Sequence, residues 1–556
     1  EATFGIRILQ LDSSRGLRVN GQTVKLRGAC IHHDSGLLGA AVYEAVEFRQ
    51  IHRLKEAGFN AVRMSHHPMA PAMLRACDFL GMYVMDEYSD MWTRMKGDFD
   101  YGLFFDEWWK SDVEAMVRQD YNHPCVIMYS VGNEIPEIGT DRGSVICNEI
   151  SGEIHMLDHT RYTTAGINGV FAAGDAVPTI MRDVAEGMAK EGKADGNVND
   201  FMTIMDSHMD EIVVHDAITE RLDKACASLD IAGYNYMTAR YRKDAVTYPE
   251  RIMVGTETYP PEIARNWKIV RDLPSLIGDF TWTGWDYRGE AGIGIPSYKA
   301  GDGGFGARFP AQIAYVGDID ITGYRRPMSY YREIVFGLRK NPYIAVQDPS
   351  HYGEPVVKTP WVLSDTVSSW TWKGFEDHRV IVEVYSAGTE TELFLNGRSL
   401  GRKESGESTD FRTLFETEYK PGTLKAVTYD ENGEQTGESS LGSAGSISTI
   451  VINEEKKCGG IDANDFMFFE IALTDRNGNV VTDEDEELML SIDGNVELMG
   501  FGSGDPKPAF APKGSITRTW NGRGQLIIKR ITDKENVRIS ISDRSGRKTV
   551  REFVFE

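Results

Sequence analysis

The chain has 556 residues and a formal net charge of −24, from 60 Lys and Arg against 84 Asp and Glu. Its length predicts two to four domains, because a single hydrophobic core stops growing well below this size. So negative a surface excludes nucleic acid and anionic membranes as partners and favours neutral or cationic ligands, although solubility alone also explains the charge. No apolar stretch approaches the ~20 residues of a membrane span.

The six cysteines include no CxxC pair, and five of them lie in apolar or helical contexts. Buried free thiols are therefore predicted in place of a disulfide framework. Free thiols are compatible with a reducing compartment, which favours the cytoplasm without establishing it. The first residues have no signal-peptide layout.

Eight short apolar runs alternate with helical patterns from residue 24 to residue 337. Continuous apolar runs are typical of parallel strands covered by helices, so eight β/α units predict an α/β fold, a (β/α)8 TIM barrel. A doubly wound open sheet is the alternative, but no GxGxxG motif follows the first strand. The expected strands are 25–31, 60–65, 83–87, 126–134, 163–167, 231–236, 252–257 and 280–287. The expected helices are 45–57, 71–80, 106–121, 145–156 and 211–227.

Two insertions interrupt this pattern, at residues 168–208 after the fifth strand and 288–318 after the eighth. Both follow the carboxyl ends of strands, the face where barrel enzymes build their sites. They are therefore expected either to shape substrate access or to be tolerated surface loops.

After residue 342 the pattern changes to short alternating strands separated by Asn-Gly turns such as Asn396-Gly397. Alternation of this kind predicts two all-β, immunoglobulin-like sandwiches, divided near residues 442–447, where Ser and Gly cluster. The predicted domains are a catalytic barrel at 1–342 and β-sandwiches at 343–444 and 445–556. The expected strands include 380–385, 392–395, 424–429, 467–473, 488–492 and 537–541.

Glu134 gives the clearest chemical signal, since it ends the apolar run Val131-Gly132-Asn133-Glu134. A carboxylate at the carboxyl end of a barrel strand lies at the mouth, where apolar walls raise a carboxyl pKa toward the value that a general acid needs. An Asn-Glu pair that caps the next helix explains the motif equally well when it is taken alone.

Glu257 ends the seventh expected strand, in Gly255-Thr256-Glu257. Its position places it across the mouth from Glu134, and two carboxylates about 5 Å apart suit a double displacement. A buried ion-pair partner is the alternative for Glu257 alone. Because the pair lies on the fourth and seventh strands, we expect Glu134 to be the acid/base and Glu257 the nucleophile.

Other polar and aromatic groups stand at neighbouring strand ends. Arg63 either holds Glu257 ionised or forms a structural ion pair. Tyr236 is a hydrogen-bond donor to the nucleophile or a core tyrosine. Trp282 and Trp285 offer flat faces for a sugar ring, although either one alone is equally typical of core packing.

The adjacent histidines at 32–33 and 66–67 raise the alternative of a zinc hydrolase. They are not spaced i, i+4, and no HExxH motif accompanies them. Hydrogen bonding of His32 and His66 to sugar hydroxyls is therefore favoured, and no metal or cofactor is predicted. Asp86, Glu87 and Asp90 end the third strand, and some of them must be structural because three more carboxylates in one site would repel.

At this point the barrel resembles glycoside hydrolase family 2, the β-galactosidase and β-glucuronidase group. The matching motifs follow in family order over the whole barrel: Gly28-Ala29-Cys30-Ile31-His32-His33-Asp34, Asn60-Ala61-Val62-Arg63-Met64-Ser65-His66, Met85-Asp86-Glu87, Ser130-Val131-Gly132-Asn133-Glu134, Gly233-Tyr234-Asn235-Tyr236, Gly255-Thr256-Glu257 and Phe280-Thr281-Trp282-Thr283-Gly284-Trp285-Asp286-Tyr287. The resemblance implies acid/base Glu134 and nucleophile Glu257. It also implies sugar or site contacts from His32, Arg63, His66, Asn133, Tyr236 and Trp282.

Three departures from the family qualify this resemblance. Members normally carry a jelly-roll and an immunoglobulin-like domain before the barrel, whereas Phe4-Gly5-Ile6-Arg7 resembles the junction that ends that region, so a missing N-terminal portion or a homo-oligomer is expected. The magnesium-binding Glu and His of some galactosidases are unmatched, with Met91 and Thr93 near their places. No Asn-x-Lys follows the eighth strand, which argues against a β-glucuronidase.

The sequence therefore predicts a retaining exo-β-glycosidase whose carbohydrate substrate is a terminal β-galactoside. A β-mannosidase, a β-glucuronidase and a non-catalytic carbohydrate-binding remnant stay as alternatives.

Overall fold

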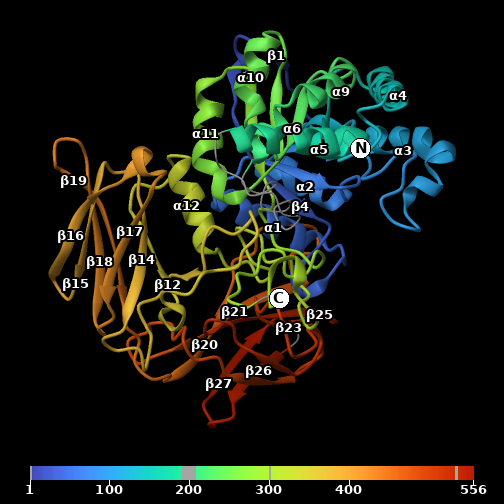
Figure 1. Cartoon of the computed structure of the whole chain (residues 1–556). Coiled ribbons are helices and arrows are strands. Elements are labelled where there is room, and N and C mark those ends of the chain that lie inside the picture. Colours follow the sequence, from blue (N-terminus) through green and yellow to red (C-terminus); the bar gives the residue numbers. More distant parts are fainter. Residues whose placement is uncertain (1–2, 191–207, 300–301, 533–535, 556) are drawn as a thin grey trace. The chain divides into compact units, whose positions relative to one another are not determined.

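The computed structural model describes residues 3–190, 208–299, 302–532 and 536–555. The chain divides into two compact units. Unit 1 comprises Glu1–His33 and Phe59–Trp282, and unit 2 comprises Asp34–Gly58 and Thr283–Glu556. Each unit is described by itself, and Figure 1 gives the labels of the elements. Within the described residues, no helix combines the length and the apolar character needed to span a membrane.

Unit 1 contains an eight-stranded parallel sheet in the order β8-β7-β6-β5-β4-β11-β10-β9. The sheet closes on itself, because the Ile167 amide N donates to the Gly233 carbonyl O at 3.1 Å and the Ile231 amide N donates to the Thr163 carbonyl O at 3.1 Å. This confirms the predicted barrel. Its strands are β4 (Leu26–His32), β5 (Ala61–Ser65), β6 (Tyr83–Glu87), β7 (Val126–Asn133), β8 (Tyr162–Gly166), β9 (Ala232–Asn235), β10 (Met253–Thr258) and β11 (Leu276–Thr281).

The eighth strand differs from its expected range of 280–287. Strand β11 consists of six buried residues, Leu276–Thr281, and pairs in parallel with β10 and β4. The strand ends where its hydrogen-bonded pairing with neighbouring strands ends. The aromatic run after residue 281 does not continue that pairing. Trp282 therefore stands just beyond a strand end, as a site residue does in this fold.

Helices of unit 1 cover the barrel, and the small antiparallel sheet of β1 (Leu9–Asp12), β2 (Gly16–Val19) and β3 (Gln22–Thr23) precedes it. The predicted helix at 211–227 is two helices, because the His215 ring Nδ1 accepts the Ala217 amide at 3.2 Å and caps the second one. The helices are α2 (Pro71–Leu80), α3 (Phe105–Asp120), α4 (Asp141–Leu157), α5 (Gly169–Ala173), α6 (Val177–Lys190), α8 (Met209–Val213), α9 (Asp216–Cys226), α10 (Arg240–Thr247) and α11 (Ile263–Asp272).

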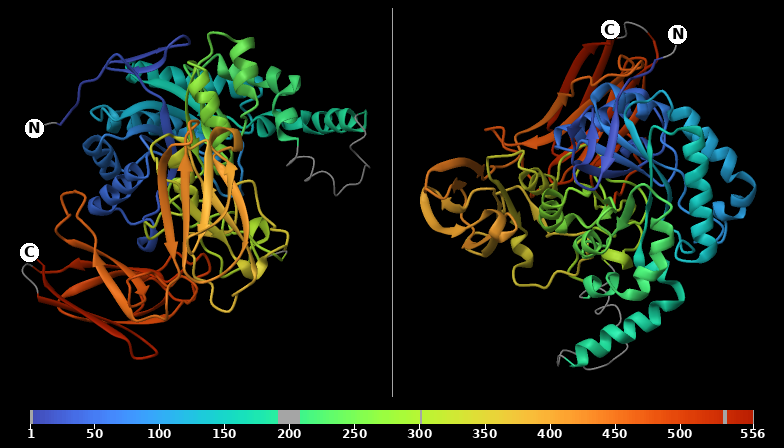
Figure 2. Two further views of the ribbon diagram at one scale, coloured as in Figure 1. Left: turned by 90° about the vertical axis from the view of Figure 1, so that its left-hand side faces the viewer. Right: turned by 90° about the horizontal axis from the view of Figure 1, so that it is seen from above.

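The insertion at 168–208 contributes α5 and α6, and its residues 191–207 lie outside the described residues. Helix α6 projects beyond the other helices of unit 1 in both views of Figure 2. Of the second insertion, residues 300–301 lie outside the described residues.

Unit 2 includes the helix α1 (Glu44–Glu56), which the sequence pattern assigns to the barrel. Arg49 of this helix forms a buried ion pair with Glu455, with Nε and Oε2 2.7 Å apart, and the Arg53 guanidinium lies 2.8 Å from the Glu470 carboxylate. These charge pairs connect α1 to the C-terminal part of the chain. Helix α12 (Pro327–Val335) also belongs to this unit.

Four antiparallel sheets make up most of the rest of unit 2, and with them the predicted all-β part is confirmed. One pair surrounds a core that includes Trp370 and Phe415, and the other surrounds a core that includes Phe469 and Leu526. The strands of the first pair are β12 (Tyr343–Gln347), β13 (Thr366–Val367), β14 (Arg379–Tyr385), β15 (Glu390–Leu395), β16 (Arg398–Glu404), β17 (Arg412–Glu418), β18 (Thr423–Tyr429) and β19 (Gln435–Gly442). Those of the second are β20 (Thr449–Glu454), β21 (Phe466–Thr474), β22 (Glu487–Asp493), β23 (Val496–Gly502), β24 (Ile516–Arg518), β25 (Arg523–Arg530), β26 (Asn536–Asp543) and β27 (Lys548–Val554).

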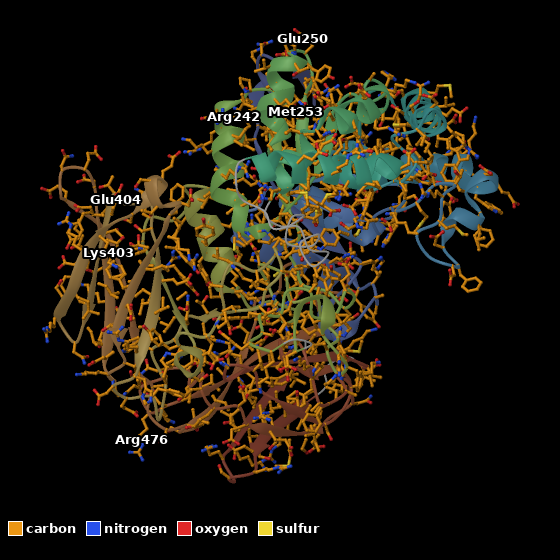
Figure 3. The ribbon with its side chains drawn as sticks, viewed as in Figure 1. Arg242, Glu250, Met253, Lys403, Glu404 and Arg476 are labelled. Carbon is orange, nitrogen blue, oxygen red and sulfur yellow. The ribbon has the colours of Figure 1, made fainter. Side chains whose placement is uncertain are left out.

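The Asn-Gly turns act as the sequence predicts. Asn396 and Gly397 have φ of 51° and 81°, and they connect β15 to β16. Strand β16 is an edge strand whose charged end, Lys403 and Glu404, is labelled in Figure 3. Charges on an edge strand discourage pairing with another sheet. The domain limits at 342 and 444 stay predictions.

Candidate active site

Seven of the eight predicted site residues lie at or just after the carboxyl ends of barrel strands of unit 1, and Arg63 lies in the middle of β5. Glu257 belongs to β10, whereas Glu250 and Met253, labelled in Figure 3, mark the opposite end of that strand. Carboxyl ends of parallel barrel strands meet at one mouth. The residues that follow or end β4, β5, β7, β9 and β11 are His32, His66, Asn133, Glu134, Tyr236 and Trp282.

Glu257 is buried against a guanidinium, with only 3% of its surface exposed. Arg63 Nη1 donates to Glu257 Oε1 at 2.8 Å and to the Thr256 carbonyl at 3.0 Å. Burial raises the pKa of Glu257 to about 7; the charge of Arg63 opposes this rise, and the charge of Glu134 adds to it. A hydrogen bond from Tyr236 also lowers the pKa. Glu257 is therefore a carboxylate close to its titration point at neutral pH.

Arg63 connects Glu257 to a second carboxylate, that of Glu87. Arg63 Nη2 donates to Glu87 Oε2 at 2.6 Å, and His66 Nδ1 lies 2.7 Å from Glu87 Oε1. Burial alone would raise the pKa of Glu87, but Arg63 and His66 outweigh it and hold that pKa at about 2. Burial lowers the pKa of His66, but the hydrogen bond and the negative charge of Glu87 outweigh it and raise that pKa. Arg63 thus pairs with the carboxylates of Glu257 and Glu87 at once.

Glu134 is held by two amides from other strand ends. Asn168 Nδ2 donates to Glu134 Oε1 at 2.9 Å, and Asn235 Nδ2 lies 3.3 Å from the same oxygen. The backbone of Glu134 has φ of 43°, a conformation that non-glycine residues rarely adopt and that clusters at functional sites. Helix α4 is capped by Thr140, whose hydroxyl accepts the Gly143 amide at 3.0 Å. The helix-cap explanation of the Asn-Glu motif is therefore wrong.

Asn133 connects Arg63 to the more exposed Asp90. Its Oδ1 accepts from Arg63 Nη2 at 2.8 Å and from Asn235 Nδ2 at 2.9 Å, while its Nδ2 donates to Asp90 Oδ1 at 2.9 Å. Lys96 Nζ donates to that same Asp90 oxygen at 2.8 Å. Asp90 and Lys96 keep 33% and 25% of their side chains exposed, so a ligand can reach them.

Aromatic rings form a wall beside these groups. The rings of His66 and Trp282 stack with centroids 5.3 Å apart and 4° between their planes, and His32 meets Trp282 edge-on at 5.1 Å. Burial, followed by the charge of His66, lowers the pKa of His32 to about 3, so this imidazole is neutral. Tyr236 stacks on Tyr259 with centroids 4.4 Å apart.

Small residues leave room for this network. A Cβ on Gly166, the last residue of β8, would lie 2.6 Å from Arg63 Nη2 and 2.9 Å from Asn133 Oδ1. A side chain there would displace the guanidinium that contacts Glu257.

Sequence reasoning missed several groups of this network. Asn168, Asn235 and Lys96 contact predicted site residues, and Glu87 and Asp90 had no assigned role. Asn235 was visible as the polar residue within the Gly233-Tyr234-Asn235-Tyr236 motif, and Asn168 as the first polar residue after β8. Lys96 lies in a loop, and no local pattern marks it.

The paired histidines do not form a group of three ligands among the residues that the structure describes. The triple that it does bring together is Asp78, His123 and Cys125. His123 Nδ1 lies 2.6 Å from Asp78 Oδ2, and the Cys125 amide donates to Asp78 Oδ1 at 2.9 Å. These bonds fix the segment that leads into β7, at the strand end opposite to Glu134, which is a structural role.

Comparison with known proteins agrees with this fold. The TIM barrel domain of glycosyl hydrolases family 2 matches residues 12–191, and the glycoside hydrolase family 2 C-terminal domain 5 matches residues 450–549. A domain of unknown function matches residues 378–437. A solved glycosyl hydrolase family 2 member from Bacteroides cellulosilyticus is 34% identical with a TM-score of 0.85, over 99% of this chain and 65% of that one.

Relatives with named activities differ in substrate. Beta-galactosidase BoGH2A from Bacteroides ovatus is 25% identical over 94% of this chain and 60% of its own length. A relative from Formosa agariphila, provisionally named a beta-glucuronidase, is 25% identical over 97% of this chain and 49% of its own length. The chain thus spans 49–60% of the length of these relatives.

A closed parallel barrel with a buried Glu257 and a half-buried Glu134 at its mouth, followed by all-β sheets, is the architecture of barrel glycoside hydrolases. The matches at both ends of the chain are specific to one family, and the chain belongs to glycoside hydrolase family 2.

Proposed function

We propose that this chain acts as a retaining exo-β-glycosidase on terminal β-galactosides. The observation that carries the proposal is the pair of glutamates at the barrel mouth. Glu257 is buried against Arg63, and Glu134, whose charge acts on Glu257, is oriented by Asn168 and Asn235. One carboxylate is thus held beside a cation, while the other is held by neutral amide donors.

These environments suit a double displacement. In the first step, Glu257 attacks the anomeric carbon while Glu134 donates its proton to the glycosidic oxygen, and the aglycone leaves as an alcohol. In the second step, Glu134 takes a proton from water, the water oxygen attacks the same carbon, and Glu257 is released. Arg63 pairs with Glu257 whenever that carboxylate carries its charge, before attack and after release.

A β-galactoside is favoured over the other family substrates. The chain lacks the Asn-x-Lys triplet after the eighth strand that the family resemblance links to a sugar carboxylate. The Bacteroides ovatus relative is named a beta-galactosidase. The acidic chain, with a formal charge of −24, also disfavours an anionic uronide.

A panel of 4-nitrophenyl glycosides tests the substrate. We expect kcat/KM for the β-D-galactoside to exceed those for the β-D-glucuronide and the β-D-mannoside at least about tenfold, which corresponds to ~1.4 kcal/mol of transition-state binding. Proton NMR of the first-formed sugar should show the β-anomer, because two inversions retain configuration. An α-anomer would contradict the double displacement, and sugar binding without turnover on any glycoside would favour the non-catalytic alternative.

The pH dependence gives a second test of the nucleophile. Glu257 must be ionised to attack, and its pKa is raised to about 7, so kcat/KM should fall as the pH is lowered through 7. The Tyr236 hydrogen bond lowers that pKa, so Tyr236→Phe should move this acid limb to higher pH. A pH profile of the variant with an unchanged limb, or with a limb shifted to lower pH, would contradict this role of Tyr236.

A further inference from the structure

Unit 2 contains a cavity of about 520 Å³ that shares no residue with the candidate active site. Five separate stretches of the chain line it, at 294–296 and 315–328 after β11, at 348–375 beside the first sandwich, and at 482–485 and 520–523 in the second. Tyr385 of β14 also lines it. Small-molecule sites have volumes of ~300–1,000 Å³, so this cavity has room for one or two hexose rings. The insertion at 288–318 thus lines a cavity in its own unit.

Seven aromatic side chains are among the residues that line the cavity, and several of them are held in place. Arg326 lies over the Tyr315 ring at 3.9 Å, and Arg523 lies over the Tyr324 ring at 4.5 Å. Trp520 Nε1 lies 3.3 Å from the Tyr315 hydroxyl. The other aromatic residues of the lining are Trp361, Trp372, Phe375 and Tyr385. Fixed aromatic rings with polar groups between them suit ligands that have both apolar faces and hydroxyls, as sugars do.

Two buried polar atoms of this lining have no hydrogen-bond partner among the described residues. They are Trp372 Nε1, a donor, and Asp483 Oδ1, an acceptor. Asp483 lies beside the chain segment that carries Trp372, because the backbone amide of Lys373 donates to the other Asp483 oxygen, Oδ2, at 3.0 Å. Buried polar groups are normally satisfied, and an exception calls for a ligand or water that supplies the missing bond. A single hydroxyl can accept from the indole N–H and donate to the carboxylate.

The charge of the lining narrows the ligand class. Six acidic and three basic side chains line the cavity. Two of the basic groups are already paired, Arg326 with Asp286 at 2.6 Å and Lys373 with Glu484. An anionic ligand such as a phosphate or a uronate would therefore meet an excess of negative charge. Neutral hydroxyls, which donate to carboxylates, fit this lining.

We propose that this cavity is a second, non-catalytic carbohydrate-binding site that takes one or two neutral sugar rings, with Trp372 and Asp483 bound to sugar hydroxyls. The proposal goes beyond the catalytic function and does not depend on it, because it concerns binding in unit 2 alone. Such a site would hold a glycan on the protein independently of its hydrolysis.

Calorimetry with lactose and cellobiose tests this site in the full-length chain carrying Glu257→Ala, so that hydrolysis does not consume the ligand. Trp372→Phe keeps an aromatic ring but removes the indole N–H. Asp483→Asn keeps one oxygen to accept the Lys373 amide, but it replaces the other oxygen, an acceptor, with an NH₂ donor. Each change should weaken one disaccharide-binding event at least tenfold. The exposed Trp108→Phe and Asp493→Asn serve as matched controls and should leave binding unchanged.

Each cavity variant is also made without Glu257→Ala and assayed on the 4-nitrophenyl glycosides. Unchanged turnover beside weakened disaccharide binding supports a separate site, whatever sugar the catalytic centre prefers. Binding of both disaccharides that neither cavity variant alters would overturn the proposal. The proposal would also be overturned by titrations in which spermidine, a cation, binds in the cavity and neither sugar does. Far-UV circular dichroism checks folding, and if one variant fails to fold, the other carries the test.

Discussion

Replacing Glu257 with alanine should lower kcat on a 4-nitrophenyl β-D-galactoside by at least about 10³-fold, because the covalent step loses its nucleophile. The change removes the carboxylate that Arg63 Nη1 contacts at 2.8 Å. Glu87 still pairs with Arg63 at 2.6 Å, so the guanidinium keeps a buried partner and the barrel should stay folded. Steady-state kinetics and a thermal melt measure the two effects.

Azide separates the role of a nucleophile from a structural role at Glu257. The anion can enter the space that the missing side chain leaves and attack the anomeric carbon directly. One inversion then gives an α-galactosyl azide, which proton NMR distinguishes from the β-product. Glu250→Ala, at the opposite end of β10, is the matched control and should keep full activity. Wild-type turnover in Glu257→Ala would rule out the assignment.

Replacing Glu134 with alanine should lower kcat/KM by about 10²–10⁴-fold on substrates with poor leaving groups, the range of general acid catalysis. Protonation of the glycosidic oxygen matters least when the aglycone leaves readily as an anion. We therefore expect a smaller loss on 2,4-dinitrophenyl β-D-galactoside than on lactose. The ratio of the two losses, measured by steady-state kinetics, reports on proton donation rather than on folding.

Azide should also raise the turnover of Glu134→Ala, but with the opposite product. The glycosyl-enzyme on Glu257 still forms, and azide then displaces it with a second inversion, which gives a β-galactosyl azide. Exposed Glu149 on α4 offers the control, and Glu149→Ala should leave both rates unchanged. Equal losses on the two leaving groups, without any azide product, would contradict an acid/base role.

Local sequence patterns determined much of this protein. Buried runs such as Val126–Asn133 predicted the barrel strands, because a strand covered by helices needs apolar side chains on both faces. Asn396-Gly397 predicted a hairpin, because its two positive φ values suit those residues. The same rules located Glu134 and Glu257, since each follows an apolar run whose end must lie at the barrel mouth.

Contacts between distant residues decided the rest. Strand β11 ends at Thr281 because its pairing with β10 and β4 ends there, which no periodicity records. Helix α1 belongs with residues 455 and 470 because its arginines pair with their carboxylates, more than 400 positions away in the sequence. Asn168 and Lys96 reach the site from loops.

The Glu134 and Glu257 pair shows which features of the site the sequence determined and which depended on the tertiary structure. The sequence located both carboxylates and their neighbour Arg63. Only the tertiary structure revealed that Arg63 is shared with Glu87, and that burial outweighs Arg63 and raises the pKa of Glu257 to about 7. Desolvation and charge pairing depend on the groups that surround a side chain in three dimensions, and residues adjacent in the chain supply few of them.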